Sequence, residues 1–434
     1  MASFDADKIL QKSGEAVSSS SLRQFHGPWR WIMSGLAIAF SVYVLLYVGD
    51  VTEWVGLRLF GSHRAIAYSI VMLLVFLFIP ARKGGDRNHI PWYDFLLAAG
   101  GAAGSFYVFW NWESQVESYA TPSVMQMVLG GITLLTTLEA ARRTLGWALA
   151  ILGAFFIFYT LYGNLFPGFL LTKGYSYSRM LGHYYLSGTG LYGSAMEIFT
   201  VVVAVYVIFA QFVQVSGAGD FFFKLGLAVV GRFRGGPAKV AVFSSSLFGT
   251  VSGLAVANVV VDGSITIPMM KKCGYKPEVA AAVEASASNG GQIMPPVMGT
   301  AAFLMADMLG IPYWGVVTAA FLPAIFYYIA LYFMLDFEAA KTGLKGLPRV
   351  QIPPIWRTLK EGGQFLLPLA VLLYFIGILG WSAQKSGLFA LLALVAVSYI
   401  RKETRPSFRQ LLGALESGAH NTAQLGPAAG AIGI

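Results

Sequence analysis

Residues 284–296 read EASASNGGQIMPP and interrupt a long stretch of apolar sequence. Glycine pairs and Pro-Pro steps disrupt regular helices, so the sequence predicts a helix over 277–308 that is broken at 286–291 and again at Pro295-Pro296. Within a bilayer, unpaired backbone groups are tolerated only where they are buried in protein or line a polar cavity. The stretch therefore predicts a polar site near the middle of a membrane.

The segment before it, residues 236–272, is apolar between two basic flanks and is interrupted at 249–253, GTVSG. Each arm has roughly 15 residues, or about 22 Å of helix, whereas the hydrocarbon core is about 30 Å thick. Short arms with charged flanks on one side predict a re-entrant helical hairpin over 237–271. Two ordinary spans joined by a very short outer turn are the alternative.

The hairpin tip at 252–258 is the expected partner of the break. Half-helix N-termini suit an anionic group, and unwound carbonyls with Ser and Asn oxygens suit a hard cation such as Na⁺. Gly290 and Gly291 permit left-handed backbone and close approach. The alternative for either interruption is a packing kink with Gly and Ser at a helix crossing, but two interruptions close together favour a site.

The composition is that of a membrane protein. Of the 434 residues, 56% are hydrophobic and 12% are charged, whereas soluble domains carry about 25% charged residues. Windows of about 20 apolar residues predict an all-α polytopic membrane protein. Full spans are expected near 30–48, 64–80, 91–110, 122–138, 145–163, 191–215, 277–308, 313–335, 365–383 and 386–400, with another beginning near 419. The single Cys273 excludes an internal disulfide.

The basic residues predict the orientation. With the N-terminus inside, five of the 30 Lys and Arg residues fall in outer loops and the remaining 25 fall inside. This asymmetry follows the positive-inside rule, so the net charge of +9 needs no nucleic-acid partner. The outer five are Arg58, Arg64, Lys173, Arg179 and Lys385. We therefore expect a multi-pass protein with a cytoplasmic N-terminus.

Two acidic residues, Asp262 and Glu284, lie near the predicted site. Intramembrane acids often carry protons, and the alternative is that they pair with Lys239, Lys271 or Lys272. Hydrolase and ATPase readings lack support, because HExxH, GxSxG and GxxxxGK[ST] are absent from the sequence. The chain is therefore not expected to be an enzyme or to hold a cofactor. A gated channel built on the same hairpin remains a rival.

A short sequence motif recurs within the chain and suggests an internal repeat. Arg179-Met-Leu181 with Ser187-Gly188 recurs as Arg409-Gln-Leu411 with Ser417-Gly418, an offset of 230 residues. The predicted topology puts the first copy outside and the second inside, as in the inverted repeats that mark secondary transporters. We expect a second repeat that starts at about 365 and is incomplete, with the chain truncated before a second hairpin.

The stretch 231–303 reads GRFRGGPAKVAVFSSSLFGTVSGLAVANVVVDGSITIPMMKKCGYKPEVAAAVEASASNGGQIMPPVMGTAAF. It resembles the large permease of tripartite ATP-independent periplasmic (TRAP) transporters, and most closely the fused 4TM/12TM permease of the TAXI subgroup. The resemblance covers roughly 120–434. It implies that 1–165 holds small-permease-like spans, with a boundary between 120 and 170, and that 166–434 is the N-terminal part of the large permease.

The resemblance implies an elevator-type transporter in the cytoplasmic (inner) membrane of a bacterium or archaeon. Its substrate would be a small organic acid or amino acid, anionic or zwitterionic, and its coupling ion Na⁺ or H⁺. An extracytoplasmic TAXI-type substrate-binding protein would deliver the substrate, and the lipid bilayer would surround the chain.

The resemblance also carries over individual residues. They are Ser252, Gly253 and Asn258 at the tip, and Ser288, Gly290, Gly291, Gln292, Pro295 and Pro296 at the break. Two departures occur: Leu254 stands where the family has Ser, and Asn289 where it has Thr or Ser. The expected positions for Na⁺ are Ser252, Gly253, Asn258, Ser288 and Gly290. Because of the departures, Na⁺ and H⁺ both remain open.

Overall fold

The chain forms helices joined by turns, as the sequence predicts. The computed structural model describes residues 23, 25, 27–54, 61–82, 89–114 and 120–434, and these contain no strand. They divide into two compact units. We call Val205–Ala414 the hairpin unit, and Ser19–Ala204 with Leu415–Ile434 the N-terminal unit. The boundary predicted near 165 separates small-permease-like spans from the large permease. It is a different boundary from that between the two units, and it stays a prediction.

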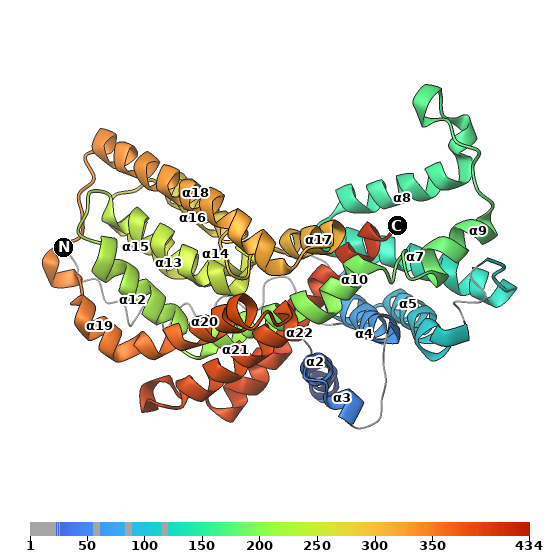
Figure 1. Cartoon of the computed structure of the whole chain (residues 1–434), viewed down its shortest axis with the longest axis horizontal. Helices are drawn as coiled ribbons and strands as arrows, with labels where there is room; N and C mark the ends of the chain where they lie inside the picture. Colours follow the sequence, from blue (N-terminus) through green and yellow to red (C-terminus); the bar gives the residue numbers. More distant parts are fainter. Residues whose placement is uncertain (1–22, 24, 26, 55–60, 83–88, 115–119) are drawn as a thin grey trace. The chain divides into compact units, whose positions relative to one another are not determined.

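The N-terminal unit is a bundle of apolar helices. Its α-helices are α2 (Pro28–Val48), α3 (Val51–Trp54), α4 (Ser62–Phe78), α5 (Trp92–Trp110), α7 (Val124–Leu145), α8 (Trp147–Tyr162), α9 (Tyr177–Leu181) and α10 (Ser194–Ile198). Short 3-10 helices span Gly163–Leu165 and Gly168–Leu170, and π-helices span Gly182–Leu186 and Phe199–Val203. In sequence order, α4 packs on α5, α5 on α7, and α7 on α8 (Figure 1).

The hairpin unit begins at Val205, the second residue of helix α11. The unit holds α11 (Ala204–Val215), α12 (Ala218–Val230), α13 (Gly236–Ser252), α14 (Ala255–Val261), α15 (Gly263–Lys272), α16 (Pro277–Gly290), α17 (Thr300–Leu309), α18 (Tyr313–Thr342), α19 (Ile355–Gly362), α20 (Leu366–Leu373) and α21 (Ala383–Ser398). A π-helix, Tyr374–Ile378, continues α20, and 3-10 helices span Arg349–Gln351, Gly363–Phe365 and Lys402–Thr404. The last helix, α22 (Phe408–Ile432), passes into the N-terminal unit at Leu415.

The core of the hairpin unit gathers around α13. This helix packs against α12, α15, α16 and α18 (Figure 1). Small buried residues such as Ala238, Ala241 and Ala287 let the helices approach, and Leu331 and Leu335 of α18 complete the cluster. The candidate site is thus built on closely packed helices.

Residues 217–240, which the topology assigned to a connecting loop, contain α12. Its side chains Phe221, Phe222 and Phe223 are buried, and Phe223 and Leu227 pack with Val240 of α13. The sequence reading missed this helix because 13 residues are too few for a span and bases follow it.

Six helices in the described residues have the length and apolar character to cross a membrane. They are Pro28–Val48, Val124–Leu145, Trp147–Leu165, Ser194–Val215, Tyr313–Thr342 and Arg349–Ile378. The helices α4, α17 and α21 are apolar but shorter. The polar N-terminal segment 1–22 and most of the predicted inner loop near 82–87 lie outside the described residues, so the predicted orientation stays a prediction.

Candidate functional site

The first arm of the predicted hairpin is one continuous helix, α13, of 17 residues. It runs through Gly249, where the interruption was expected to begin, and ends only at Gly253. Gly253 has φ +61 and its N–H donates to the carbonyl of Gly249 at 3.0 Å. A left-handed residue at this position ends a helix, and glycine adopts it at least cost. The chain then turns and returns through α14 and α15.

The break in the second helix also begins later than predicted. Helix α16 continues through the SASN segment 286–289 to Gly290, residues 291–297 form turns and a bend, and 298–299 lead into the next helix. Tyr327 and Tyr328 of α18 donate to the carbonyls of Ser286 (2.7 Å) and Ala287 (3.1 Å). These bonds satisfy carbonyls near the end of the helix, which explains why the polar residues do not end it earlier.

The two prolines lie inside the turn and do not begin the next helix. Helix α17 starts at Thr300 with Gly299 as its N-cap, whereas the carbonyl of Pro296 accepts a hydrogen bond from Tyr313 at 2.8 Å. The Pro295-Pro296 peptide bond is cis. The helix predicted over 277–308 is therefore interrupted once, from Gly291 to Gly299, and Pro295-Pro296 lies within that single interruption.

The paired glycines serve close approach. Neither Gly290 nor Gly291 has a positive φ; in the break that conformation belongs to Met298, at +57. A Cβ on Gly291 would lie 2.7 Å from the Cα of Gly249, and one on Gly290 would lie 2.5 Å from Tyr327. Real Cβ atoms do not approach so closely. Both positions therefore require glycine because a larger side chain would collide with its neighbours.

The hairpin tip and the break are in contact. The N–H of Val297 donates to the carbonyl of Thr250 at 3.3 Å. A Cβ on Gly253 would overlap the carbonyl oxygen of Met298, and Gly249 faces Gly291 backbone to backbone. The two interrupted segments thus meet, and the binding of an ion or a substrate between them stays a prediction.

The remaining predicted site residues lie in different surroundings. Ser252 is buried at the end of α13. Asn289 and Gln292 are exposed, and the Gln292 amide donates to the Asn289 side-chain oxygen at 3.0 Å. Asn258 is fully buried on α14 and donates to the carbonyl of Ser245 at 2.9 Å. The five residues expected to hold Na⁺ therefore lie in two places. Ser252, Gly253 and Gly290 lie at the ends of α13 and α16, whereas Asn258 and Ser288 belong to a buried polar cluster.

That cluster is built around Asp262 and Glu284, which are 5% and 0% exposed. Hydroxyl groups surround both carboxyls. The Oγ of Ser245 lies 2.8 Å from Asp262 and 2.9 Å from Glu284. The hydroxyls of Ser244 (2.6 Å, to Asp262), Ser288 (3.1 Å, to Glu284) and Thr266 (to Glu284) complete the set. Ser244, Ser245 and Thr266 are not among the site residues that the sequence predicts. The SSS run 244–246 in an apolar arm is a signal for the two serines, whereas Thr266 carries no comparable signal.

No base neutralises the two acids in the part of the chain that the structure describes. Lys239, one expected partner, pairs with Asp336 of α18 at 2.6 Å. The side-chain oxygen of Asn258, one helical turn before Asp262, is buried without a hydrogen-bond partner. Buried charges are costly unless something pairs with them. An acceptor-rich cluster of this kind can hold a proton or a hard cation.

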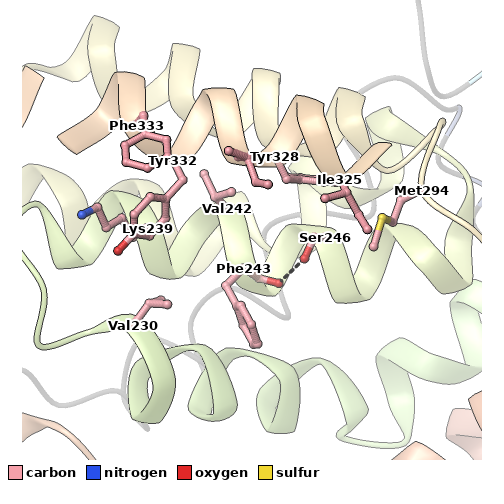
Figure 2. Close-up of a pocket in the computed structure, with 11 residues that line it drawn as sticks. Val230, Lys239, Val242, Phe243, Ser246, Met294, Ile325, Tyr328, Tyr332 and Phe333 are labelled. Atoms are coloured by element: carbon pink, nitrogen blue, oxygen red, sulfur yellow. Dashed lines mark hydrogen bonds between the residues drawn. The ribbon is translucent and has the colours of Figure 1, made fainter. Parts of the chain in front are cut away.

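A cavity beside helix α13 is mainly apolar. A cavity of about 290 Å³ lies between α12, α13 and α18, and Met294 from the break lines it (Figure 2). Its wall is mainly apolar. The hydroxyl of Ser246 is turned to the carbonyl of Phe243 at 2.8 Å, and Lys239 is paired with Asp336. This cavity therefore does not offer an ion site.

Comparison with known proteins identifies the class to which this fold and site belong. Residues 132–434 match the family described as the tripartite ATP-independent periplasmic transporter, DctM component. The chain belongs to this family, whose members are transport components and not enzymes. Together with the apolar helices, membership makes the chain an integral inner-membrane protein.

Individual relatives align over shorter stretches. The C4-dicarboxylate TRAP transporter large permease protein DctM of Vibrio cholerae is 32% identical over 129 residues, 29% of this chain and 28% of that protein. The ectoine/5-hydroxyectoine TRAP transporter large permease protein UehC of Ruegeria pomeroyi is 40% identical over 73 residues, 17% of each chain. The uncharacterised protein y4mL of Sinorhizobium fredii is 33% identical over 147 residues, 33% of this chain and 34% of that protein. The chain thus spans about a third or less of these relatives.

Proposed function

We propose that this chain is the large-permease part of a secondary active transporter that imports a small organic acid or amino acid on a Na⁺ or H⁺ gradient. An extracytoplasmic binding protein of the TAXI type delivers the substrate. Small-permease spans fused before the boundary at 120–170, a cytoplasmic N-terminus and elevator movement of inverted repeats belong to the same proposal. Family membership supports its general form.

The contact between the hairpin tip and the break is the observation that carries the proposal. Helices α13 and α16 end at neighbouring positions, and Gly249 in the last turn of α13 touches Gly291 just after the end of α16. Interrupted helices at membrane depth are tolerated where they form a binding site. The polar side chains of Asn289 and Gln292 are exposed beside this contact and can meet a polar solute.

The buried acidic cluster supports coupling to a cation. Asp262 and Glu284 share Ser245 as a neighbour and have no basic partner among the described residues. A proton or a Na⁺ ion would supply the missing positive charge. Because the cluster packs on the hairpin arms α13 to α15, its occupancy can influence the tip.

The names of the relatives and the geometry of the tip support the proposed substrate class. A C4-dicarboxylate is anionic and ectoine is zwitterionic, and both are small. A solute of this kind fits a site made of backbone dipoles and amide side chains.

The proposal is tested by uptake into proteoliposomes that contain the purified protein and its binding protein. Radiolabelled succinate, glutamate and ectoine serve as probes. We expect accumulation of one of them under an imposed Na⁺ or H⁺ gradient, only with the binding protein, and without ATP. Accumulation driven by internal ATP in the absence of a gradient would refute the proposal. Passive equilibration without the binding protein would indicate a channel instead.

A further inference from the structure

A basic cavity lies at one end of the N-terminal unit, and we call it the arginine cavity. Helix α4 ends and α5 begins beside it, as do the end of α7 and the start of α8. Its volume is about 770 Å³. Its wall includes Arg23, Arg82, Glu139, Arg142, Arg143 and Trp147.

Two of these arginines form a rigid, buried wall. The side chains of Arg23 and Arg143 are each 1% exposed, and both pair with the fully buried Asp94. Arg23 also donates to the last carbonyls of α4, at Phe76 (3.0 Å) and Leu77 (3.1 Å). These contacts satisfy a helix end that otherwise lacks partners, so the cavity wall is held in place independently of any ligand.

The wall keeps an excess of positive charge. The four guanidinium groups of the wall face two carboxylates, Asp94 and Glu139, so an excess of two positive charges remains among these six described residues. Arg82 is exposed and takes part in no ion pair with a described residue. The Nε of Arg23 is buried and lacks a hydrogen-bond acceptor. An anion with several oxygen atoms would supply both the charge and the acceptor.

The surroundings of the cavity are apolar and outward-facing. Trp147 and Ile151 of α8 are exposed, as are Trp92 and Leu96 of α5. The guanidinium of Arg142 lies 5.1 Å from the ring centre of Trp147. Exposed tryptophans at the ends of apolar helices are typical of the level of lipid headgroups. Basic pockets between membrane helices bind anionic headgroups.

We propose that the arginine cavity binds the phosphate headgroup of an anionic phospholipid, whose acyl chains lie along the exposed faces of α5 and α8. The lipid is favoured over free phosphate because the basic wall continues into apolar surface on two helices. This inference concerns the N-terminal unit alone, and it does not depend on the proposed transport function.

Native mass spectrometry of the purified full chain tests the inference. Phosphatidylglycerol, phosphatidylcholine of the same chain length and inorganic phosphate are each titrated onto the protein. We expect retention of phosphatidylglycerol in preference to phosphatidylcholine. The double variant Arg82→Gln/Arg142→Gln should weaken this binding about tenfold. The matched control is Arg179→Gln in the same unit, whose guanidinium lies 5.1 Å from the Tyr175 ring centre and which should bind like wild type.

Three outcomes would overturn the inference: equal retention of the two lipids, unchanged binding by the double variant, or displacement of phosphatidylglycerol by inorganic phosphate. The last would indicate a site for free anions. If the double variant does not fold, Arg82→Gln alone decides the test. Arg82 has no ion pair within the described residues, so its loss should weaken binding by a few-fold and leave the fold intact.

Discussion

Glu284 is a fully buried carboxyl that touches three hydroxyl groups and no base in the described chain. Its position on α16, four residues before Ser288, links the acidic cluster to the break. Hydroxyls lower the cost of a buried charge but do not neutralise it. At the scale of single residues, this combination supports the proposed coupling to a cation.

Removing either charge should therefore uncouple transport. In proteoliposomes, Glu284→Gln and Asp262→Asn should reduce gradient-driven accumulation at least about tenfold, the equivalent of one lost polar interaction of about 1–3 kcal/mol. Exchange of labelled for unlabelled substrate without a gradient should persist. Glu278→Gln, an exposed acid in the first turn of the same helix, is the control. Wild-type accumulation by both buried-acid variants would contradict this role.

Sequence alone could predict the acids but not their neighbours. Intramembrane Asp and Glu residues are rare enough to be noticed, whereas Ser and Thr pack in any membrane helix. Pairing with Lys239 looked plausible by position; in the structure Asp336, which is distant in sequence, takes that base. A contact of this kind depends on how α13 and α18 pack, which no local pattern records.

At the scale of elements, the approach of α13 to the break depends on glycine. Gly249→Ala would place a methyl group 2.5 Å from the Cα of Gly291, and backbone cannot move aside as cheaply as a side chain. We expect a loss of about 1–3 kcal/mol in stability, as for overpacked cores. It would be measured as a lower thermal unfolding temperature of the purified protein.

Gly413→Ala is the matched control, because Gly413 also lies inside a helix but has open space around it. Alanine has the higher helix propensity, so this variant should be at least as stable as wild type. Equal unfolding temperatures for Gly249→Ala and Gly413→Ala would mean that the tip and the break are not in close contact.

Element boundaries were harder to predict than their existence. The hairpin and the broken helix both follow from glycine and proline in apolar sequence. The sequence predicts that the interruptions start at Gly249 and Ser286, which is too early in both cases. Local sequence shows the helix-breaking residues but not the tertiary contacts that keep them helical. The hydroxyls of Tyr327 and Tyr328, on α18, donate to carbonyls in the last turns of α16 and stabilise its continuation to Gly290. Such tertiary contacts override local helix propensity.

At the scale of the whole molecule, the distribution of charge predicts which loops face the cytoplasm. Cysteines at Lys345 and Lys173, both exposed, test it in a Cys273→Ser background. In intact cells a membrane-impermeant thiol reagent should label Lys173→Cys and leave Lys345→Cys unlabelled. Replacing Cys273 removes the only native thiol, whose burial raises its pKa and would slow its labelling. Labelling of Lys345→Cys from outside would reverse the predicted topology.

The family could be recognised from 231–303 because that stretch combines the hairpin and the break. The division into two units could not be predicted, since its boundaries at Ala204 and Ala414 fall within helices and carry no linker signal. Helix α12 could not be predicted either. With 13 residues it is too short to count as a membrane span, so the sequence predicts a loop there.

The central claim is that the tip and the break form the transport site, and the exposed side chains of the break test it most directly. Asn289→Ala and Gln292→Ala should fold normally, because both residues are exposed and bond mainly to each other. Gln351→Ala, at another exposed glutamine in the 3-10 helix Arg349–Gln351, is the control.

The measurement is the initial rate of gradient-driven uptake in proteoliposomes with equal amounts of each protein. The account predicts that Asn289→Ala and Gln292→Ala each lower the rate about tenfold, as for a lost polar contact, while Gln351→Ala transports like wild type. Wild-type rates for all three variants would contradict the account and leave the break as a packing kink.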